Sequence, residues 1–418
     1  MLQETLVLFK NIRQPAYKGS LEEYENNGGY QTCKKVLKEM QPAAALEKIM
    51  KSGLRGRGGA GFPTGMKWSF MAKNTGKPSY LVCNADEGEP GTFKDREIML
   101  KDPHLFLEGM ILGCFVVGCN QGYIYVRGEY FEAIETLERE IKRLEEKKYL
   151  GEKIFGSPFG LKLIVHPGAG AYICGEETAL LDSLEGKRGL PRVKPPFPAV
   201  SGFNESPTSV NNVETLSNLP FILNAGPEAF CALGSPNNAG THIVGLSGHV
   251  KNPGAYEVKM GENLKTIIED LGGGTSSGKK IKAVIPGGSS SPILTAQEID
   301  VAYDFDSLAK IGTMMGSAGV IILDETVSIP KLLLRVISFY AHESCGQCTP
   351  CREGMNWLRI NLRELLEGKH PSSWIDQIVR IAKNIMGNTL CPFGDAGAMP
   401  VISYIQKFRP EFEAFCKK

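Results

Sequence analysis

The stretch Ser344-Cys345-Gly346-Gln347-Cys348-Thr349-Pro350-Cys351 decides how the end of the chain folds, because it places three cysteines at C-x2-C-x2-C spacing. Cys391 follows far along the chain, with Pro392 directly after it. A short cysteine run and a remote Cys-Pro together are one way of supplying four thiolates to a [4Fe-4S] cluster. A structural zinc site is the alternative, although it usually takes its cysteines as two separate C-x2-C pairs. The sequence therefore predicts a cluster held by Cys345, Cys348, Cys351 and Cys391.

The segments around these cysteines have the apolar spacing of helices. Helical periodicity is found over residues 331–344, 352–367, 373–386 and 396–408. The cysteine run lies between the first two segments and Cys391 between the last two. This order predicts a C-terminal four-helix bundle whose loops carry the cluster.

Composition excludes several classes of protein. Lysine and arginine number 47 against 46 aspartates and glutamates, so no overall charge favours nucleic acid as a partner. The other seven of the 11 cysteines have no regular spacing, as expected of reduced thiols in a cytoplasmic protein. The apolar run at residues 6–9 is too short for the core of a signal peptide. Residues 109–126 lack charge but contain several glycines, which predicts a buried helix followed by a strand and no direct insertion into a membrane.

Strand and helix patterns alternate in the first part of the chain. Strands are predicted at residues 80–83, 123–126 and 161–165, with helices at about 103–117 and 130–148 between them. This β-α-β-α-β order is typical of a doubly wound α/β fold with a parallel sheet. A further helix is predicted at residues 42–52, with proline at its start and Gly53 at its end.

A glycine-rich segment at residues 53–68 follows that helix. Residues 56–61 match G-x-G-x-x-G, but the ordinary dinucleotide fingerprint requires a strand before them, so that interpretation is rejected. Glycines still let backbone N–H groups approach a phosphate or a planar ring, and Arg57 and Lys67 supply positive charge. A mobile linker is the alternative. Because Phe62 and Trp68 lie in the same segment, we favour a cofactor cradle.

Four later segments carry further candidate groups, each with a structural alternative. The acidic loop at residues 84–91 follows a predicted strand, where ligands bind in α/β sheets, but it also resembles a solvated turn. A second glycine-rich loop, at residues 168–178, enters a helix, where its two glutamates either serve a ligand or stabilise the helix dipole. The proline-rich segment 191–198 either holds an aromatic ring over a pocket or is a connector. Residues 210–215 offer amides for a ligand or a helix cap.

The pattern of predicted elements and the composition of the loops change at about residue 240. Strands are predicted at residues 243–246, 256–258 and 282–285, with a helix near 263–271 and loops rich in glycine, serine and proline. This pattern indicates a small β-grasp module that ends near residue 330. It carries no titratable constellation, so a spacer or docking role is expected.

These motifs, in this order, resemble those of a known family, that of the flavin-bearing NADH-oxidising 51-kDa or F subunit of respiratory complex I. The resemblance covers nearly the whole chain. It implies a Rossmann-like FMN- and NADH-binding domain at residues 1–238, a ubiquitin-like β-grasp domain at 239–330 and a helical bundle with a [4Fe-4S] cluster at 331–418. No side chain is implied as a nucleophile or general acid, since the cofactors carry the hydride chemistry.

Site residues follow from the same resemblance. The residues implied to surround FMN are Arg57, Gly58, Gly59, Lys67, Asn84, Asp86, Glu87, Gly175, Glu176, Glu177, Val210, Asn211, Asn212 and Thr215. Those implied to bind NADH are Phe62, Lys67, Phe70, Glu89, Glu177, Lys194 and Phe197, with the three phenylalanines against the adenine and Glu177 near the nicotinamide. The acidic loop also predicts preference for NADH, because it repels the extra phosphate of NADPH.

The implied function is oxidation of NADH by hydride transfer to FMN, with single electrons passed to the cluster and on toward quinone. The implied partners are a thioredoxin-like [2Fe-2S] subunit of the E type and a larger iron–sulfur subunit of the peripheral arm. The implied location is cytoplasmic, peripheral to the inner membrane through the complex. The alternatives are the diaphorase subunit of a soluble NAD-linked hydrogenase or formate dehydrogenase, a non-catalytic electron-transfer adapter, and a β-grasp ligand-binding module attached to a metal-stabilised bundle.

Overall fold

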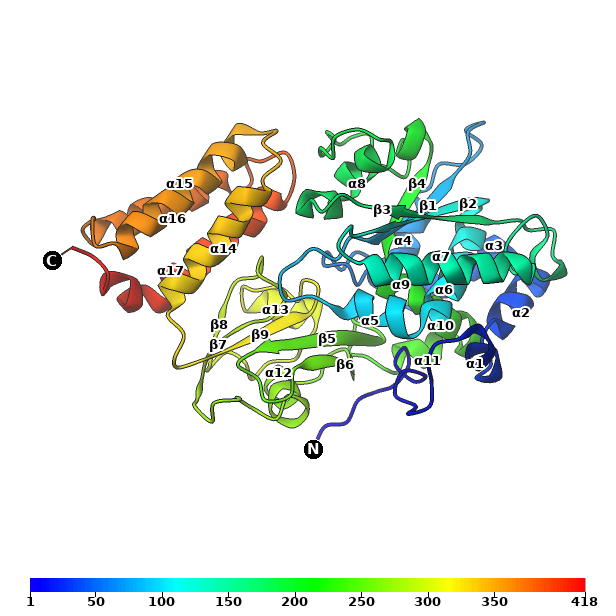
Figure 1. Cartoon of the computed structure of the whole chain (residues 1–418), viewed down its shortest axis with the longest axis horizontal. Helices are drawn as coiled ribbons and strands as arrows, with labels where there is room; N and C mark the ends of the chain where they lie inside the picture. The colour runs from blue at the N-terminus through cyan, green and yellow to red at the C-terminus, as the bar shows by residue number, and fades with distance from the viewer. Residues whose placement is uncertain (418) are drawn as a thin grey trace.

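The computed structural model describes residues 1–417, and its first part is built on a parallel sheet with the strand order β3-β2-β1-β4 (Figure 1). All three predicted strands are confirmed. The fourth, at one edge, carries the residues that the sequence suggested only as a ligand loop or cap. The strands are β1 Tyr80–Ala85, β2 Gln121–Val126, β3 Lys162–Pro167 and β4 Thr208–Asn212.

Both faces of this sheet are covered, as its strands require. Leu81 and Cys83 of β1 pack in the core that includes α6 (Pro103–Val117), while Val82 between them packs on the other side, with residues of α8 (Glu177–Leu184). Near-continuous apolar strands of this kind are typical of parallel sheets. The predicted helices α6 and α7 (Phe131–Glu146) are confirmed, and α6 followed by β2 is the buried helix and strand expected of residues 109–126.

Shorter helices surround the sheet, and most of them were not predicted. The predicted helix at residues 42–52 is α3 Pro42–Lys51, with Pro42 at its first position. The others are α1 Leu21–Asn26, α2 Gln31–Glu39, α4 Thr64–Ser69, α5 Lys94–Lys101, α9 Val213–Ser217, α10 Leu219–Ala225 and α11 Pro227–Cys231, with 3-10 turns η1 Ile154–Gly156, η2 Tyr172–Gly175 and η3 Phe203–Glu205.

A second, mixed sheet follows, with the strand order β6-β5-β9-β7-β8. Its neighbours pair antiparallel except for β5 and β9, which are parallel. A separate apolar core lies between this sheet and its short helices. The elements are β5 Thr241–Gly248, β6 Gly254–Lys259, α12 Leu264–Thr266, the π-turn η4 Ile267–Leu271, β7 Ile281–Ile285, β8 Leu294–Thr295, α13 Phe305–Lys310 and β9 Gly319–Asp324.

The last part of the chain is helical. The helices are α14 Ile329–Glu343, α15 Thr349–Leu366, α16 Ser373–Ile385 and α17 Phe393–Glu413. Each packs against its neighbours in the group, and all four share one apolar core. They occupy one end of the molecule, the first sheet occupies the other, and the second sheet lies below and between (Figure 1). The predicted end of this part, Lys418, lies outside the described residues.

One continuous core joins the first sheet to the C-terminal helices. Val82 and Val210 of the first sheet, Leu180 of α8 and Tyr340 of α14 belong to the same buried cluster. Ala283 of the second sheet also belongs to it. The three parts of the chain are therefore packed together through apolar contacts as well as through the loops described below. Among residues 1–417, no helix is long and apolar enough to span a membrane.

Candidate functional site

The glycine-rich loop after α3 is folded back on itself and is not a mobile linker. Gly56 N donates to Phe62 O at 2.9 Å, and Thr64 N donates to Leu54 O at 2.8 Å. Gly59 has φ +125°, a conformation that other residues rarely adopt. The loop therefore presents a bare backbone surface of fixed shape.

This loop lies on the end of β4. Arg57 N donates to Thr215 Oγ1 at 2.8 Å, and Trp68 Nε1 donates to Asn211 Oδ1 at 2.9 Å. A Cβ atom at Gly58 would stand 3.1 Å from the Cβ of Asn212, so glycine allows this close approach. Two motifs more than 140 residues apart in sequence thus form one surface at the carboxyl edge of the sheet, where α/β sheets bind ligands.

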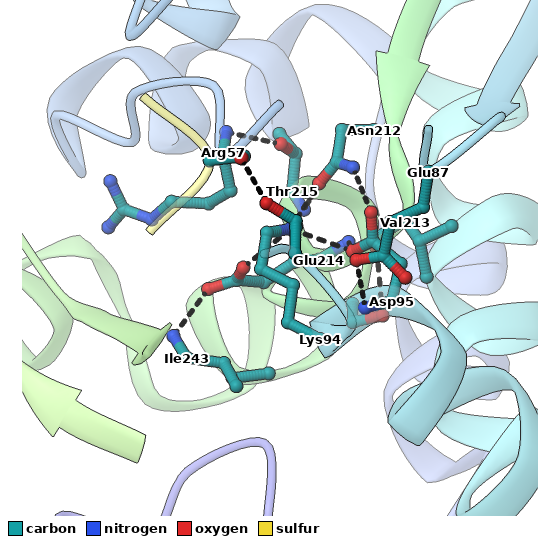
Figure 2. A network of polar contacts seen from close by, with 12 residues as sticks. Arg57, Glu87, Lys94, Asp95, Asn212, Val213, Glu214, Thr215 and Ile243 are labelled. Carbon is teal, nitrogen blue, oxygen red and sulfur yellow. Dashed lines mark hydrogen bonds and ion pairs between the residues drawn. The ribbon is translucent and has the colours of Figure 1, made fainter. Parts of the chain in front are cut away.

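The side chain of Arg57 is fully buried, and its Nη2 donates to Ala239 O at 2.7 Å. Figure 2 shows the guanidinium pointing away from Glu214 and Lys94. Burial lowers its pKa to about 10. Its Nε and Nη1 are also buried, with no hydrogen-bond partner among residues 1–417, and the place of Arg57 beside a ligand stays a prediction. Val210, similarly, is buried in the sheet core.

A buried ionic layer lies under the loop, and most of it has no counterpart in any sequence motif. Lys94 Nζ lies 2.8 Å from Asp95 Oδ1 and 2.9 Å from Glu214 Oε2, with all three side chains almost inaccessible. Asn212 Nδ2 donates to Asp95 Oδ2 at 2.6 Å, and Figure 2 shows these groups converging from α5, β4 and α9. Burial opposes ionisation of Glu214, but His242 and the ammonium of Lys94 hold its pKa below its usual range. This layer fixes the start of α9, and with it the cradle.

The three carboxylates of the acidic loop that follows β1 lie in different environments. Glu87 is buried and accepts hydrogen bonds from Asp95 N and Arg96 N at the start of α5. Its place beside a ligand stays a prediction. Burial raises the pKa of Asp86 to about 7, and its Oδ2 is buried with no hydrogen-bond partner in residues 1–417. Asn84 Nδ2 donates to Gly175 O at 2.9 Å, which joins this loop to the second glycine-rich loop.

The second glycine-rich loop enters α8 as predicted, and the helix-terminal role considered for its glutamates is seen at Glu176. Glu176 caps the helix, accepting from Thr178 N and Ala179 N at 2.9 and 3.0 Å. Lys194 Nζ lies 2.9 Å from both Glu176 Oε1 and Glu177 Oε1, and Lys67 Nζ lies 3.2 Å from Glu177 Oε2. The ion pairs raise the pKa of Lys194 against the opposing effect of its burial.

Three aromatic side chains expected at the NADH site are exposed. Phe62, Phe70 and Phe197 are 46%, 57% and 57% exposed, unusually high for phenylalanine. The rings of Phe62 and Phe70 lie 6.4 Å apart, between centroids. Glu89 is placed differently from the other predicted ligands, since its carboxylate accepts from Tyr172 Oη at 2.6 Å.

The four motif cysteines lie in the loops and first turns of the C-terminal helices. Cys345 and Cys348 lie between α14 and α15, Cys351 begins α15, and Cys391 precedes α17. Ser344 Oγ lies 3.2 Å from Cys351 Sγ. Burial raises the pKa of Cys351 to about 11 and that of Cys391 to about 12, with the other thiols adding to the effect.

The donor set consists of four free cysteines packed on one apolar core. Four thiolates are the ligands that a [4Fe-4S] cluster takes. Among residues 1–417, no three Cys, His, Asp or Glu side chains converge closely enough to hold one metal ion. Of the seven remaining cysteines five are buried, but Cys231 is exposed and Cys416 half-buried.

Residues on either side of α8 contact the segments that carry the cysteines. Arg188 Nη2, just beyond α8, donates to Cys345 O at 3.2 Å, and Tyr172 N donates to Glu343 Oε2 at 3.1 Å. The ring of Tyr172 packs edge-on against Phe393, at a centroid distance of 5.7 Å. The charge of Glu176 also contributes to the raised pKa of Cys391. Neither Arg188 nor Tyr172 was predicted, because only the tertiary fold brings them to the cysteines.

Comparisons with known proteins agree with this division of the chain. Residues 49–220 match the family model described as the Nuo51 FMN-binding domain, and residues 331–415 match the NADH-ubiquinone oxidoreductase-F iron-sulfur binding region. Residues 242–322 match the SLBB domain. The chain is also similar to a solved NAD+-reducing [NiFe]-hydrogenase in the air-oxidised state, with a TM-score of 0.85 and 32% identity over 99% of this chain and 67% of that one.

Relatives of known name match over the full length. The F 2 subunit of NADH-quinone oxidoreductase of Rhizobium meliloti (strain 1021) is 49% identical over 408 residues, 98% of this chain and 97% of the relative. The F subunit of NADH-quinone oxidoreductase of Rickettsia felis (strain ATCC VR-1525 / URRWXCal2) is 46% identical over 415 residues, 99% of this chain and 98% of the relative. Identity of this degree over the whole chain shows descent as well as fold, and the chain belongs to the family of NADH-quinone oxidoreductase F subunits.

Proposed function

We propose that this protein is the NADH-oxidising flavoprotein subunit of an NADH-quinone oxidoreductase. The observation that carries the proposal is the meeting of three groups: two glycine-rich loops, the buried and unpartnered Oδ2 of Asp86 between them, and the cysteine loop that Arg188 touches. Bound FMN would supply acceptance of a hydride from NADH and release of its electrons one at a time, and a [4Fe-4S] cluster would receive them.

The cradle residues fit a flavin. The backbone at Gly58 and Gly59 and the amide of Asn212 offer donors to a phosphate and a ring, in the way that close backbone approach allows. Burial raises the pKa of Asp86 to about 7, and its carboxyl group can accept from a ligand hydroxyl when ionised and donate to it when protonated. Glu87, Val210 and Arg57 contribute through the backbone or through support of the loop. The remaining proposed FMN contacts are Lys67, Asn84, Gly175, Glu176, Glu177, Asn211 and Thr215.

NADH is proposed to bind at the exposed side of the same cradle. Phe62, Phe70 and Phe197 offer ring faces for the adenine, and Lys194 offers a cation to the diphosphate. Glu177 holds Lys67 and Lys194 beside the cradle and positions the nicotinamide, while Glu89 receives ribose hydroxyls. Because Glu89 repels a 2′-phosphate, we propose preference for NADH over NADPH. Unchanged NADPH kinetics in Glu89→Gln would count against that preference.

The cluster is proposed to be held by Cys345, Cys348, Cys351 and Cys391, which the family match to an iron-sulfur binding region supports. We propose three domains: a Rossmann-like FMN and NADH domain at residues 1–238, a β-grasp domain at 239–330 and a four-helix bundle at 331–418. The strand order of the second sheet, with its first and last long strands parallel in the centre, supports the β-grasp assignment. The relatives' names place them as subunits, so partner subunits are proposed for this chain too.

The proposed partners are a thioredoxin-like [2Fe-2S] subunit and a larger iron–sulfur subunit, which together would hold this chain on the cytoplasmic face of the membrane. The second candidate is the diaphorase part of a soluble NAD-linked hydrogenase, favoured by the TM-score of 0.85 to such an enzyme. It ranks second because identity is 32% there, against 49% to an F-type relative from an NADH-quinone oxidoreductase. Purification of the tagged chain from solubilised membranes distinguishes the two. Recovery of the chain with partner subunits and NADH:quinone activity would favour the first candidate, and recovery from the soluble fraction with hydrogenase activity would favour the second.

Anaerobic purification followed by NADH titration tests the proposal. We expect one FMN, four iron atoms and four sulfides per chain, with NADH bleaching the flavin absorbance and then producing the EPR signal of a reduced cluster. A chain that holds the cluster but no flavin would be an electron-transfer adapter. A chain whose flavin NADH does not bleach would overturn the proposal.

A further inference from the structure

A loop of the second sheet enters the proposed NADH site. Gly287-Gly288-Ser289-Ser290 follows β7, and all four residues are buried. Gly288 N donates to Gly319 O at 2.8 Å, and Gly287 N donates to Ser291 Oγ at 3.0 Å, so the loop is anchored in its own sheet. The sequence offered no function for this part of the chain beyond a spacer or docking role.

The tip of this loop holds the carboxylate of Glu89. Ser290 N donates to Glu89 Oε1 at 2.8 Å, and Ser289 Oγ donates to the same oxygen at 3.2 Å. In the other direction, Ser289 N donates to Pro90 O at 3.2 Å. A Cβ atom at Gly288 would stand 2.4 Å from Glu89 Cγ, and Gly288 has φ +92°, so both space and backbone require glycine there.

The same serine also contacts the helix that leads to the cysteines. Ser289 Oγ lies 3.0 Å from the hydroxyl of Tyr340, which is fully buried in α14. Tyr172, from the loop before α8, donates to Glu89 Oε2 at 2.6 Å. Glu89 therefore receives hydrogen bonds from the second sheet on one oxygen and from the flavin-side loop on the other.

The carboxylate of Glu89 retains capacity for one more donor. A carboxylate can accept about four hydrogen bonds, and here three are already made. The residue as a whole is half-buried. Burial raises the pKa of Glu89, whereas the hydrogen bonds from Tyr172, Ser290 and Ser289 lower it and favour the charged form.

We propose that the loop Gly287–Ser290 is a positioning element of the NADH site: Ser289 and Ser290 aim the carboxylate of Glu89 at the ribose hydroxyls of the dinucleotide. The inference rests on the proposed function, since it assumes that Glu89 meets NADH. It gives the second sheet a direct part in substrate binding, in addition to any docking role. Ser289 is a positioning residue, because it acts through Glu89 and not on the substrate itself.

A double-mutant cycle on the flavin-loaded holoenzyme tests the inference, with NADH as substrate and ferricyanide as acceptor. Ser289→Ala is expected to raise the KM for NADH about fivefold with kcat unchanged, as loss of one hydrogen bond to a charged group predicts. Glu89→Gln is expected to raise the KM further. If Ser289 acts through Glu89, the double variant Ser289→Ala/Glu89→Gln will match Glu89→Gln alone.

The control is Ser403→Ala. Ser403 is a buried serine that also joins the second sheet to a C-terminal helix, accepting from Ile293 N at 3.3 Å, but it does not contact Glu89. It is expected to lower the thermal midpoint and leave the KM unchanged. If Ser289→Ala fails to retain flavin, Ser289→Cys replaces it in the cycle, because a thiol is a weak donor of similar size.

An unchanged KM in Ser289→Ala, or an equal rise in both backgrounds, would overturn the inference while leaving the proposed function standing. An effect of Ser289→Ala with none from Glu89→Gln would also overturn it, since the serine would then act by another route. Failure of NADH to bleach the flavin of the unmutated holoenzyme is a separate result, which would overturn the proposed function itself.

Discussion

The proposed cradle and the cysteine loops lie against each other but are built in opposite ways. The cradle is held by charges and directed hydrogen bonds, with Lys67, Glu177 and Lys194 paired at its mouth and Lys94 and Glu214 paired below it. The cysteines sit instead on an apolar core, and their sulfurs have few polar contacts, such as that of Ser344 Oγ with Cys351 Sγ.

This difference follows from what each region has to bind. A flavin or dinucleotide is recognised through many weak contacts, which must be in place before it arrives if binding is not to cost ordering entropy. A cluster is held by four strong bonds to thiolates, so the protein needs only to deliver the sulfurs and exclude water. The cradle should therefore survive changes to the cysteines, while the cysteine loops should depend on their metal.

Loss of a cysteine ligand is expected to have the largest effect on electron transfer, and it should separate the loss of the cluster from the retention of FMN most clearly. Cys391→Ser should abolish the cluster and electron transfer to quinone, because a remote ligand cannot be replaced by the three in the run. FMN content and bleaching by NADH should remain. Iron analysis, EPR and flavin absorbance measure these quantities. Cys416→Ser, a half-buried cysteine in the same part of the chain, is the matched control and should keep four irons. Loss of flavin along with iron would show that the two regions are not independent.

Disruption of the buried ionic layer should have the second largest effect, which is a loss of stability and of FMN binding. Glu214→Gln leaves the ammonium of Lys94 without one of its carboxylate partners, and breaking a buried pair in this way costs about 3–5 kcal/mol. The thermal midpoint and the retained FMN should both fall, with the cysteine region unaffected. The double variant Lys94→Met/Glu214→Gln should lose less than the sum of the two single variants, because it removes both buried charges. Additive losses would mean that the pair is not coupled.

A change at the mouth of the cradle should separate NADH binding from FMN binding. Lys194→Met removes the cation proposed for the diphosphate and should raise the KM for NADH about tenfold, the cost of one charge-assisted hydrogen bond. FMN content should not change. The control is Lys187→Met, because Lys187 is exposed and pairs only with Glu185 on the same surface. If FMN were lost and the KM of the remaining holoenzyme unchanged, Lys194 would belong to the flavin side.

Much of this architecture could be predicted from local sequence. Strong apolar periodicity identified α7 and the four C-terminal helices, since long patterned segments depend little on tertiary context. The spacing of the cysteine run was sufficient to predict it as a set of cluster ligands. Short elements such as α4 and α9 were missed, because helices of one or two turns are stabilised by packing and not by their own propensity.

The sequence predicted which loops form the site more accurately than it predicted the direction of each side chain in them. Arg57 and Glu87 lie in the right loops, yet one is buried under the loop and the other caps α5. Sequence cannot show which way a side chain points when the backbone turns through glycines. Lys94 and Ser289 were missed for a different reason, because their partners lie more than 100 residues away and no local pattern marks them.

The smallest expected effect concerns the one cradle carboxylate that the protein leaves unpaired. Burial raises the pKa of Asp86 to about 7, whereas in an unfolded chain it is about 3.9. Between these values the folded state binds more protons than the unfolded state, so flavin-free protein should lose stability as pH rises from 5.5 to 7.5. Asp86→Asn removes that contribution and should make the slope of thermal midpoint against pH slightly less steep. The change is small because Glu87 and Glu257, whose pKa values are also raised to about 7, still contribute to the slope.

Added FMN should flatten the slope of the unmutated protein in the same way, because a ligand donor to Asp86 favours its charged form. The slope of Asp86→Asn should respond less to FMN. An equal response in both proteins would mean that Asp86 does not meet the ligand. The cradle would then be complete without it, and its contrast with the cysteine loops, which depend on their metal, would be sharper still.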